Sequence, residues 1–348
     1  MSTDAEFEAF VGPYRAELHA HCYRMLGSIH DADDALQDAL LRAWRAMGRF
    51  EGRSSARTWL YRIATNACLD LIGRRPKRVL AMDDAPPSDP REGPGPPIAE
   101  TAWIEPYPDA GLEYEQRESV ELAFVAALQH LPPLQRAALI MREVLGYSAK
   151  EAADALDTTA TAINSALQRA RKAVDEHAPE RSQQATLAAL GDDELRELVE
   201  GYADAWERGD VQAIVARLAE DATIAMPPMA TWFRGRDDVA TFLRDWAFAH
   251  PWQADQAAFR GDAAERSVRL VPTRANGQLA FASYRWDPGR GTHVPMALQV
   301  LTLRDRRIAD ITGFVMPAVF AHFDLPDHPD DARSRAAVDE VASSLTRR

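Results

Sequence analysis

Residues Arg57–Arg78 read RTWLYRIATNACLDLIGRRPKR. On a 3.6-residue period the apolar side chains gather on one side, which predicts a helix whose core face holds Leu60, Ile63, Ala64, Ala67 and Leu71. Polar side chains fall on the opposite side, namely Thr58, Arg62, Thr65 and Asn66. From Arg49 to Arg78 there are eight Lys or Arg and two acids, although the whole chain has a net charge of −13. A basic surface on an acidic protein indicates contact with a polyanion, because each cation that neutralises a phosphate releases a counterion. A solvated, arginine-rich helix end is the plainer alternative.

The composition limits the class of protein. A chain of 348 residues with 46% apolar content predicts two or three packed domains. Its two cysteines, Cys22 and Cys68, lie in no C-x-x-C pair and near no pair of histidines, so we expect no zinc site, no disulfide and no cofactor. The N-terminus lacks the apolar segment of a signal peptide, and no run of 18 apolar residues occurs. We therefore expect no membrane span and a cytoplasmic protein.

The segment before this helix predicts a second amphipathic helix. Residues Asp31–Met47 read DADDALQDALLRAWRAM, with an apolar stripe formed by Leu36, Leu40, Ala43, Trp44 and Met47. Acids fill its N-terminal half, where the helix dipole stabilises them. Asp38 lies beyond the first turn, so the polar side chains around it are typical of a docking surface. A loop over residues 48–56 joins the two helices.

Together these helices resemble region 2 of the sigma-70 superfamily, and most closely that of the extracytoplasmic-function (ECF) sigma factors. The patterns D-A-x-D-x-x-Q-D…A-W and T-W-L-x-x-I-A-x-N-x-x-x-D carry the resemblance. It implies that residues 5–78 bind the clamp helices of the largest subunit of RNA polymerase and melt the −10 promoter element. The implied polymerase-binding residues are Asp33, Asp34, Gln37, Asp38, Leu41, Arg42 and Arg45. The implied −10 residues are Arg53, Ser54, Ser55, Arg57, Trp59, Arg62, Asn66, Arg74 and Arg75.

Two roles fit Trp59. An unstacked base needs a pocket with polar edges and a stacking wall, which an aromatic ring provides. At its angular position, however, Trp59 lies beside the core face of its helix. Packing in the core is therefore the favoured role.

Residues 79–112 predict a linker. They hold eight of the chain's 22 prolines, and from Val79 to Ser119 there are ten acids and two basic residues. Such a stretch is expected to be extended or disordered. It is either a plain tether or, as the resemblance implies, an acidic strand in a nucleic-acid channel of polymerase. Trp103 and Tyr107 are unusual in polar surroundings, and we expect them to dock on the C-terminal domain.

Residues 113–176 predict a helix-turn-helix. Ser148 and Glu151 form a capping box at the start of a short helix, and a longer helix begins near Ala160. The segment LPPLQRAALIMREVLGYSAKEAADALDTTATAINSALQRARKAV resembles sigma region 4, which implies contact with the −35 element and the polymerase flap. Asn164 and Ala166 stand where many relatives carry Lys and Arg. The second helix of such a unit enters the major groove, and its candidate residues are Thr159, Thr161, Asn164, Ser165, Gln168, Arg169, Arg171 and Lys172.

Residues 187–326 predict helices followed by strands, with a hairpin turn at Asn276-Gly277. Segments from LVEGYADAWERGD to ITGFV resemble the SnoaL-like, ketosteroid-isomerase-like fold, an α+β cone with a curved antiparallel sheet. A pocket for a small apolar ligand would be lined by Met226, Met229, Trp232, Phe233, Trp246, Tyr284, Trp286, Met296 and Phe314, for which plain core packing is the favoured alternative. Asp221, Asp255 and His293 are polar candidates, but they form no acid–base pair at a telling spacing. Residues 327–348 are a charged tail.

The order of these parts predicts a multidomain protein with two all-α domains and a C-terminal α+β cone. It is identified as a member of the ECF sigma factors, with a fused C-terminal domain that regulates it. That implies binding to core RNA polymerase and promoter DNA, a monomer when free, and no enzymatic activity. One alternative is a ligand-sensing helix-turn-helix regulator, which leaves the polymerase-docking residues unexplained. The other is a SnoaL-like enzyme with a regulatory helical half.

Overall fold

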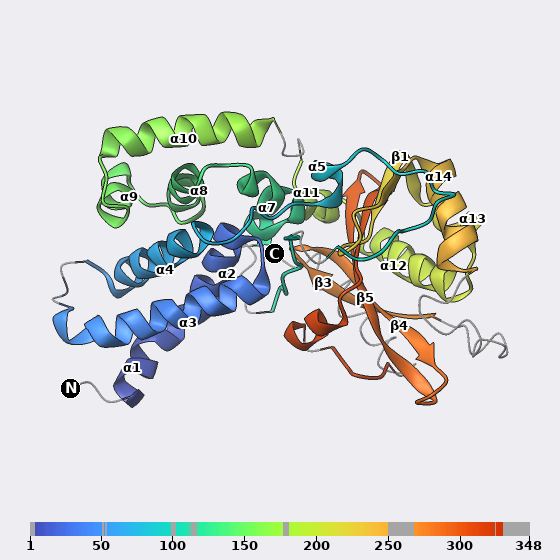
Figure 1. Cartoon of the computed structure of the whole chain (residues 1–348), viewed down its shortest axis with the longest axis horizontal. Helices are drawn as coiled ribbons and strands as arrows, with labels where there is room; N and C mark the ends of the chain where they lie inside the picture. Colours follow the sequence, from blue (N-terminus) through green and yellow to red (C-terminus); the bar gives the residue numbers. More distant parts are fainter. Residues whose placement is uncertain are drawn as a thin grey trace. The chain divides into compact units, whose positions relative to one another are not determined.

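A computed structural model describes residues 4–50, 52, 54–98, 102–110, 112, 117–176, 181–249, 268–323 and 325–329. The chain divides into two compact units, which Figure 1 shows as mainly helical and mainly sheet. The helical unit comprises residues 1–79 and 111–180, and the sheet unit comprises residues 80–110 and 181–348. Two predicted site residues, Arg53 and Asp255, lie outside the described residues, as does most of the charged tail.

The first half of the helical unit, residues 4–78, is a small bundle. It consists of α1 (Asp4–Val11), α2 (Arg15–Leu26), α3 (Ile29–Ala46) and α4 (Ala56–Ile72), with 3₁₀ turns at Gly12–Tyr14 and Met47–Arg49. The 3₁₀ turn at Pro13 separates α1 from α2, because proline cannot donate to an α-helical ladder. Side-chain caps begin the later helices: Ser28 accepts from the Asp31 amide, and Ser55 accepts from the Thr58 amide.

Both α2 and α3 pack against α4, so more of α4 is buried than one apolar stripe suggests. Thr65, expected on the polar side, is fully buried. Its hydroxyl donates to the Tyr61 carbonyl at 2.7 Å and lies 2.9 Å from His21 Nε2. The prediction for Thr65 is therefore wrong, because a second helix covers that side of α4.

The second half of the helical unit, residues 117–176, contains the helix-turn-helix. Its elements are a 3₁₀ turn (Glu118–Val120), α7 (Leu122–Gln129), α8 (Pro133–Leu139) with a π-helical extension (Ile140–Val144), α9 (Ala149–Ala155) and α10 (Ala160–Asp175). The predicted capping box is confirmed: Ser148 N donates to Glu151 Oε2 at 2.8 Å, and Glu151 N donates to Ser148 Oγ at 3.2 Å.

The sheet unit begins with α5 (Ala81–Asp84) in the linker and continues with α11 (Gln183–Ala188), α12 (Asp192–Glu207), α13 (Val211–Val215) and α14 (Arg236–Phe242), which a π-helical turn extends (Leu243–Ala247). Its strands are β1 (Leu218–Ala225), β2 (Trp232–Arg234), β3 (Val268–Ala275), β4 (Gln278–Asp287), β5 (Thr292–Arg304) and β6 (Arg307–Phe314), and a 3₁₀ turn follows (Pro317–His322).

The six strands form one sheet in the order β2-β1-β6-β5-β4-β3. The predicted antiparallel sheet is confirmed with one difference, because β1 and β6 pair in parallel. Helix α12 packs on this sheet, and their shared core includes Tyr202, Phe233 and Phe281. Within the described ranges, no helix is both long enough and apolar enough to cross a bilayer.

Most side chains predicted to line a pocket lie in the core of the sheet unit. The buried ones are Met226, Met229, Trp232, Phe233, Tyr284 and Phe314. Trp246, Trp286 and Met296 are partly exposed. Of the polar candidates, Asp221 is exposed and pairs with Arg304, and His293 stacks edge-on against Trp286 at 5.2 Å.

Candidate nucleic-acid interface

The outer face of α3 carries the residues predicted to bind polymerase. Asp33, Asp34, Gln37, Asp38, Leu41 and Arg45 are exposed along it. Arg42 is half-buried and pairs with Asp38 at 2.6 Å and Asp70 at 2.8 Å. The acids therefore lie at the surface, where Asp33 contacts His19 and Asp34 pairs with Arg75, while Arg42 ties α3 to α4.

Trp44 belongs to this outer face, although its sequence position suggested the core stripe. Leu41 is 45% exposed and Trp44 44% exposed, and residues three apart on a helix are neighbours. The buried line of α3 consists largely of alanines, namely Ala32, Ala35, Ala39 and Ala43. The spacing of these alanines in the sequence could have identified the buried side of α3. Small side chains let α3 approach its neighbours closely, so the large Trp44 indole lies on the outer face.

The residues predicted to meet the −10 element lie in and before α4. Ser54, Ser55, Arg62 and Arg74 are exposed, while Arg57, Trp59 and Asn66 are half-buried. Arg57 pairs with Glu17 at 3.0 Å and lies over the Tyr61 ring. Trp59 packs against the rings of Phe50 and Phe10, with centroids 5.0 and 6.1 Å away. An aromatic cluster thus holds Trp59 in place.

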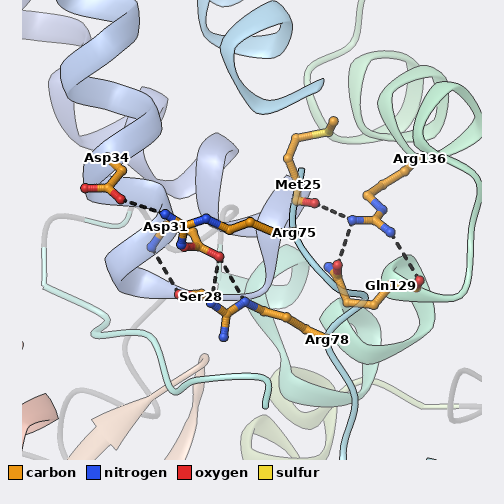
Figure 2. A network of polar contacts seen from close by, with 8 residues as sticks. All are labelled: Met25, Ser28, Asp31, Asp34, Arg75, Arg78, Gln129 and Arg136. Atoms are coloured by element: carbon orange, nitrogen blue, oxygen red, sulfur yellow. Dashed lines mark hydrogen bonds and ion pairs between the residues drawn. The ribbon is translucent and has the colours of Figure 1, made fainter. Parts of the chain in front are cut away.

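Besides Arg57, two more of the predicted −10 cations have carboxylate partners. Arg62 Nη2 lies 2.7 Å from Asp157 Oδ1, which belongs to the turn before α10. Arg75 pairs with Asp31 and with Asp34. Asp31 is buried and also forms an ion pair with Arg78, as Figure 2 shows. In the packed helical unit both cations are therefore held by ion pairs within the protein.

His21 is buried beside Thr65 of α4 and is neutral there. Burial, together with the charges of Arg24 and Arg57, lowers the pKa of His21 from 6.5 to about 3. An unfolded chain binds a proton at His21 near pH 6.5, so stability falls as the pH drops below that value. We expect His21 alone to lower the free energy of unfolding by about 2 kcal/mol between pH 7.5 and pH 5.

Chemical denaturation at both pH values tests this expectation. The His21→Gln variant keeps a polar side chain beside Thr65 but cannot titrate, so its stability should change less between the two pH values than that of the wild type. An identical pH dependence in the two proteins would contradict the role given to His21.

Helix α10 presents all the residues predicted to meet the −35 element on its exposed side: Thr159, Thr161, Asn164, Ser165, Gln168, Arg169, Arg171 and Lys172. Thr159 also caps the helix by accepting from the Ala162 amide, and Arg171 pairs with Glu143. Ala166 is only 1% exposed. It packs inside the helical unit and is not among the exposed side chains of α10.

The two halves of the helical unit pack against each other around Arg136, which is 4% exposed (Figure 2). Its guanidinium donates to the Met25 carbonyl in the first half, and to Gln129 Oε1 and the carbonyls of Gln129 and Leu131 in the second. Gln129 Nε2 in turn donates to the Arg24 carbonyl at 3.3 Å. This network was not predicted, because buried arginines are rare and leave no local pattern.

The linker lies along the sheet unit at two places. Near its start, Trp232 Nε1 donates to the Ala85 carbonyl at 2.8 Å, and Ser88 N donates to the Trp232 carbonyl at 2.8 Å. Gly93 rests on the Trp246 indole so closely that a Cβ atom would have no room. Two of the rings predicted to line a pocket, Trp232 and Trp246, therefore contact the linker.

The second place is the β3–β4 turn. Tyr107 is buried, and its backbone exchanges hydrogen bonds with Asn276, at 2.9 Å to the side chain and 2.8 Å to the main chain. Asp109 accepts from the Gly277 amide at 2.7 Å and from Arg274 Nε at 2.9 Å. Trp103 is also buried, with Nε1 donating to the Ile98 carbonyl.

Comparison with known families covers most of the chain. Residues 10–78 match Sigma-70 region 2, residues 121–174 match Sigma-70, region 4, and residues 199–311 match the SnoaL-like domain. The crystal structure of the extracytoplasmic function sigma factor SigJ from Mycobacterium tuberculosis is similar in fold. It has a TM-score of 0.57 and 22% identity, with 93% of this chain and all of that chain covered.

Curated relatives agree with these matches. SigM of Mycobacterium tuberculosis, an ECF RNA polymerase sigma factor, is 33% identical over 165 residues, which cover 47% of this chain and 73% of SigM. SigG of the same organism, also an ECF RNA polymerase sigma factor, is 40% identical over 329 residues, which cover 92% of this chain and 84% of SigG. The chain belongs to the ECF RNA polymerase sigma factors.

Proposed function

We propose that this sigma factor binds core RNA polymerase through the outer face of α3 and directs it to promoters. In this proposal, α4 and the loop before it contact and open the −10 element, and α10 reads the −35 element. The supporting observations are that nearly all of the α3 and α10 sets are exposed on their helices, and that five of the nine predicted −10 residues are exposed, namely Ser54, Ser55, Arg62, Arg74 and Arg75. The chain acts in the cytoplasm, is a monomer until it joins polymerase, contacts the clamp helices and flap, and performs no catalytic step.

The packed helical unit is an inactive form in this proposal. The names of the two promoter elements place them about 25 base pairs apart, roughly 85 Å at 3.4 Å per base pair. In the packed unit α4 contacts α9, and Arg62 reaches Asp157 next to α10. Since α10 itself is only about 24 Å long, α4 and α10 cannot meet both elements at once. The two halves must separate before transcription begins.

Separation requires the linker. Fully extended, residues 79–112 span at most about 120 Å, which is enough for the promoter distance. While the linker is docked beside Trp232 and Asn276, it cannot extend to this length. The sheet unit therefore regulates the protein by binding the docked linker better than the extended one, which shifts the population toward the packed form.

Polymerase docking is tested by the Leu41→Glu, Trp44→Glu double variant. Both side chains are exposed, so the cost to folding is small. Loss of two apolar anchors at an interface is expected to weaken binding to core polymerase by about 10-fold or more, as measured by comigration on native gels. Ala188→Glu with Ala189→Glu adds the same charge at exposed positions of the sheet unit and serves as control. Equal binding by all three proteins would exclude α3 as the docking surface.

A further inference from the structure

A cavity of about 400 Å³ opens in the helical unit beside the network of Figure 2. Its walls come from both halves, namely the end of α4 with the residues that follow it and the loop between α7 and α8. Leu26, Leu71 and Leu131 supply an apolar wall. Among the described residues of its lining, four are cationic, Arg75, Lys77, Arg78 and Arg136, and one is a carboxylate, Asp31. The lining is therefore strongly positive in a protein whose net charge is −13.

Asp31 does not balance this charge. It already pairs with both Arg75 and Arg78, and Asp34, outside the cavity, adds only one further bond to Arg75. Lys77 Nζ lies 2.9 Å from His130 Nδ1, a ring nitrogen that carries no negative charge. Among the described residues, Lys77 and Arg136 thus have no carboxylate partner.

Arg136 shows the imbalance most clearly. Its partners are three main-chain carbonyls and one amide oxygen, and in the part of the chain that the structure describes none is a carboxylate. Its Nε is buried with no hydrogen-bond acceptor among those residues. Burial lowers the pKa of Arg136 to about 10, which still leaves it charged at neutral pH. A buried charge without a counterion is costly, and an anion in the adjoining cavity would reduce that cost.

We propose that this cavity binds a small molecule that carries phosphate groups. Guanidinium and ammonium groups suit phosphate oxygens, and several cations together favour a multiply charged anion. The volume lies in the range of small-molecule sites, so it leaves room for a further part of the ligand against the leucine wall. Arg136 and the largely buried Arg78 lie where the backbone of a DNA duplex could not reach them, which favours a small ligand.

A ligand bound in this cavity would stabilise the packed form of the helical unit. Because both halves of the helical unit line the cavity, the ligand binds the packed arrangement and not the separated one, so it slows formation of the promoter complex. This consequence rests on the proposed function. The binding itself does not, and a direct titration measures it alone.

Isothermal titration calorimetry of the full chain with GTP, ATP and inorganic pyrophosphate tests the site. Binding of at least one probe is expected, and Arg75→Gln with Lys77→Gln should weaken it by about 10-fold or more, because two charge-assisted contacts are lost. Both positions are exposed, so the variant should fold. Arg74→Gln, one residue away and outside the cavity, removes the same kind of charge and should leave the affinity unchanged.

Three results would overturn the proposal. They are no binding of any probe at millimolar concentration, unchanged affinity in the Arg75→Gln, Lys77→Gln variant, and an equal loss in Arg74→Gln. The last result would identify a diffuse phosphate-backbone surface for DNA instead of a site. Binding of a probe without any effect on transcription would leave the site intact and count against the packed form as the inactive state.

Discussion

The Arg62→Cys, Asp157→Cys double variant, joined by a short thiol-cleavable bismaleimide, is expected to lose promoter-dependent transcription by about 100-fold or more. The cross-link holds α4 beside the turn that precedes α10, so nearly all molecules stay in the packed form. The fraction of molecules with separated halves, which alone can initiate transcription in this proposal, then falls close to zero. Positions 62 and 157 are exposed, whereas the native Cys22 and Cys68 are buried. The reagent should therefore react at the introduced thiols. Run-off transcription before and after cleavage measures the effect.

The same double variant without cross-linker is the control, because Arg62 is itself a predicted DNA contact. Cleavage of the cross-link should restore transcription to the level of this control. If the cross-linked protein initiates as well as the control does, the two halves do not need to separate, and the packed form is not the inactive one.

Asp109→Ala is expected to release the second docked segment of the linker. Asp109 and Arg274 form an ion pair with side chains only 7% and 12% exposed, and Asp109 also holds the Gly277 amide. Removing one partner of a buried pair costs about 3–5 kcal/mol, since the other charge stays buried. This cost is larger than the free energy with which a segment of a few residues can be held on the sheet unit. Hydrogen exchange at residues 105–110 should increase, and transcription by the full chain should rise.

Asp89→Ala is the matched control, because Asp89 is a half-exposed linker acid whose contacts, an ion pair with Arg91 at 3.9 Å and a bond from the Arg91 amide at 3.0 Å, stay within the linker. Exposed pairs of this kind contribute little, about 0–1 kcal/mol. Trp103→Ala with Tyr107→Ala removes two buried rings of the same linker and should act in the direction of Asp109→Ala. Unchanged hydrogen exchange and unchanged transcription in both variants would show that the docked linker does not restrain the protein.

Elements with strong local signals were predictable from the sequence. Among the helices predicted ahead of the strands in residues 187–326, α12 spans Asp192–Glu207 and has acids in its first turn. The capping box at Ser148 and the hairpin turn at Asn276-Gly277 also formed as expected, and both turn residues have positive φ. In each case a few adjacent residues determine the backbone, so distant contacts change little.

The features that were missed depend on distant partners. Thr65 is buried because α2 covers a side of α4 that periodicity alone assigns to solvent. The parallel pairing of β1 with β6 joins strands far apart in the chain. Arg136 pairs with Met25, 111 positions away, and no local pattern marks an arginine as buried. Trp103 and Tyr107 suggested that the linker docks on the C-terminal domain, but nothing in the sequence identifies the partners Trp232, Asn276 and Arg274, which lie far from it in the chain.

Run-off transcription with purified core RNA polymerase tests the central claim most directly. The template is the promoter region upstream of the protein's own gene, and the proteins are the full chain and a chain that ends near Glu176. We predict that both initiate, and that the shortened chain is more active because it lacks the domain that holds the linker. If neither chain initiates and neither comigrates with core polymerase, the proposed role in transcription initiation is wrong.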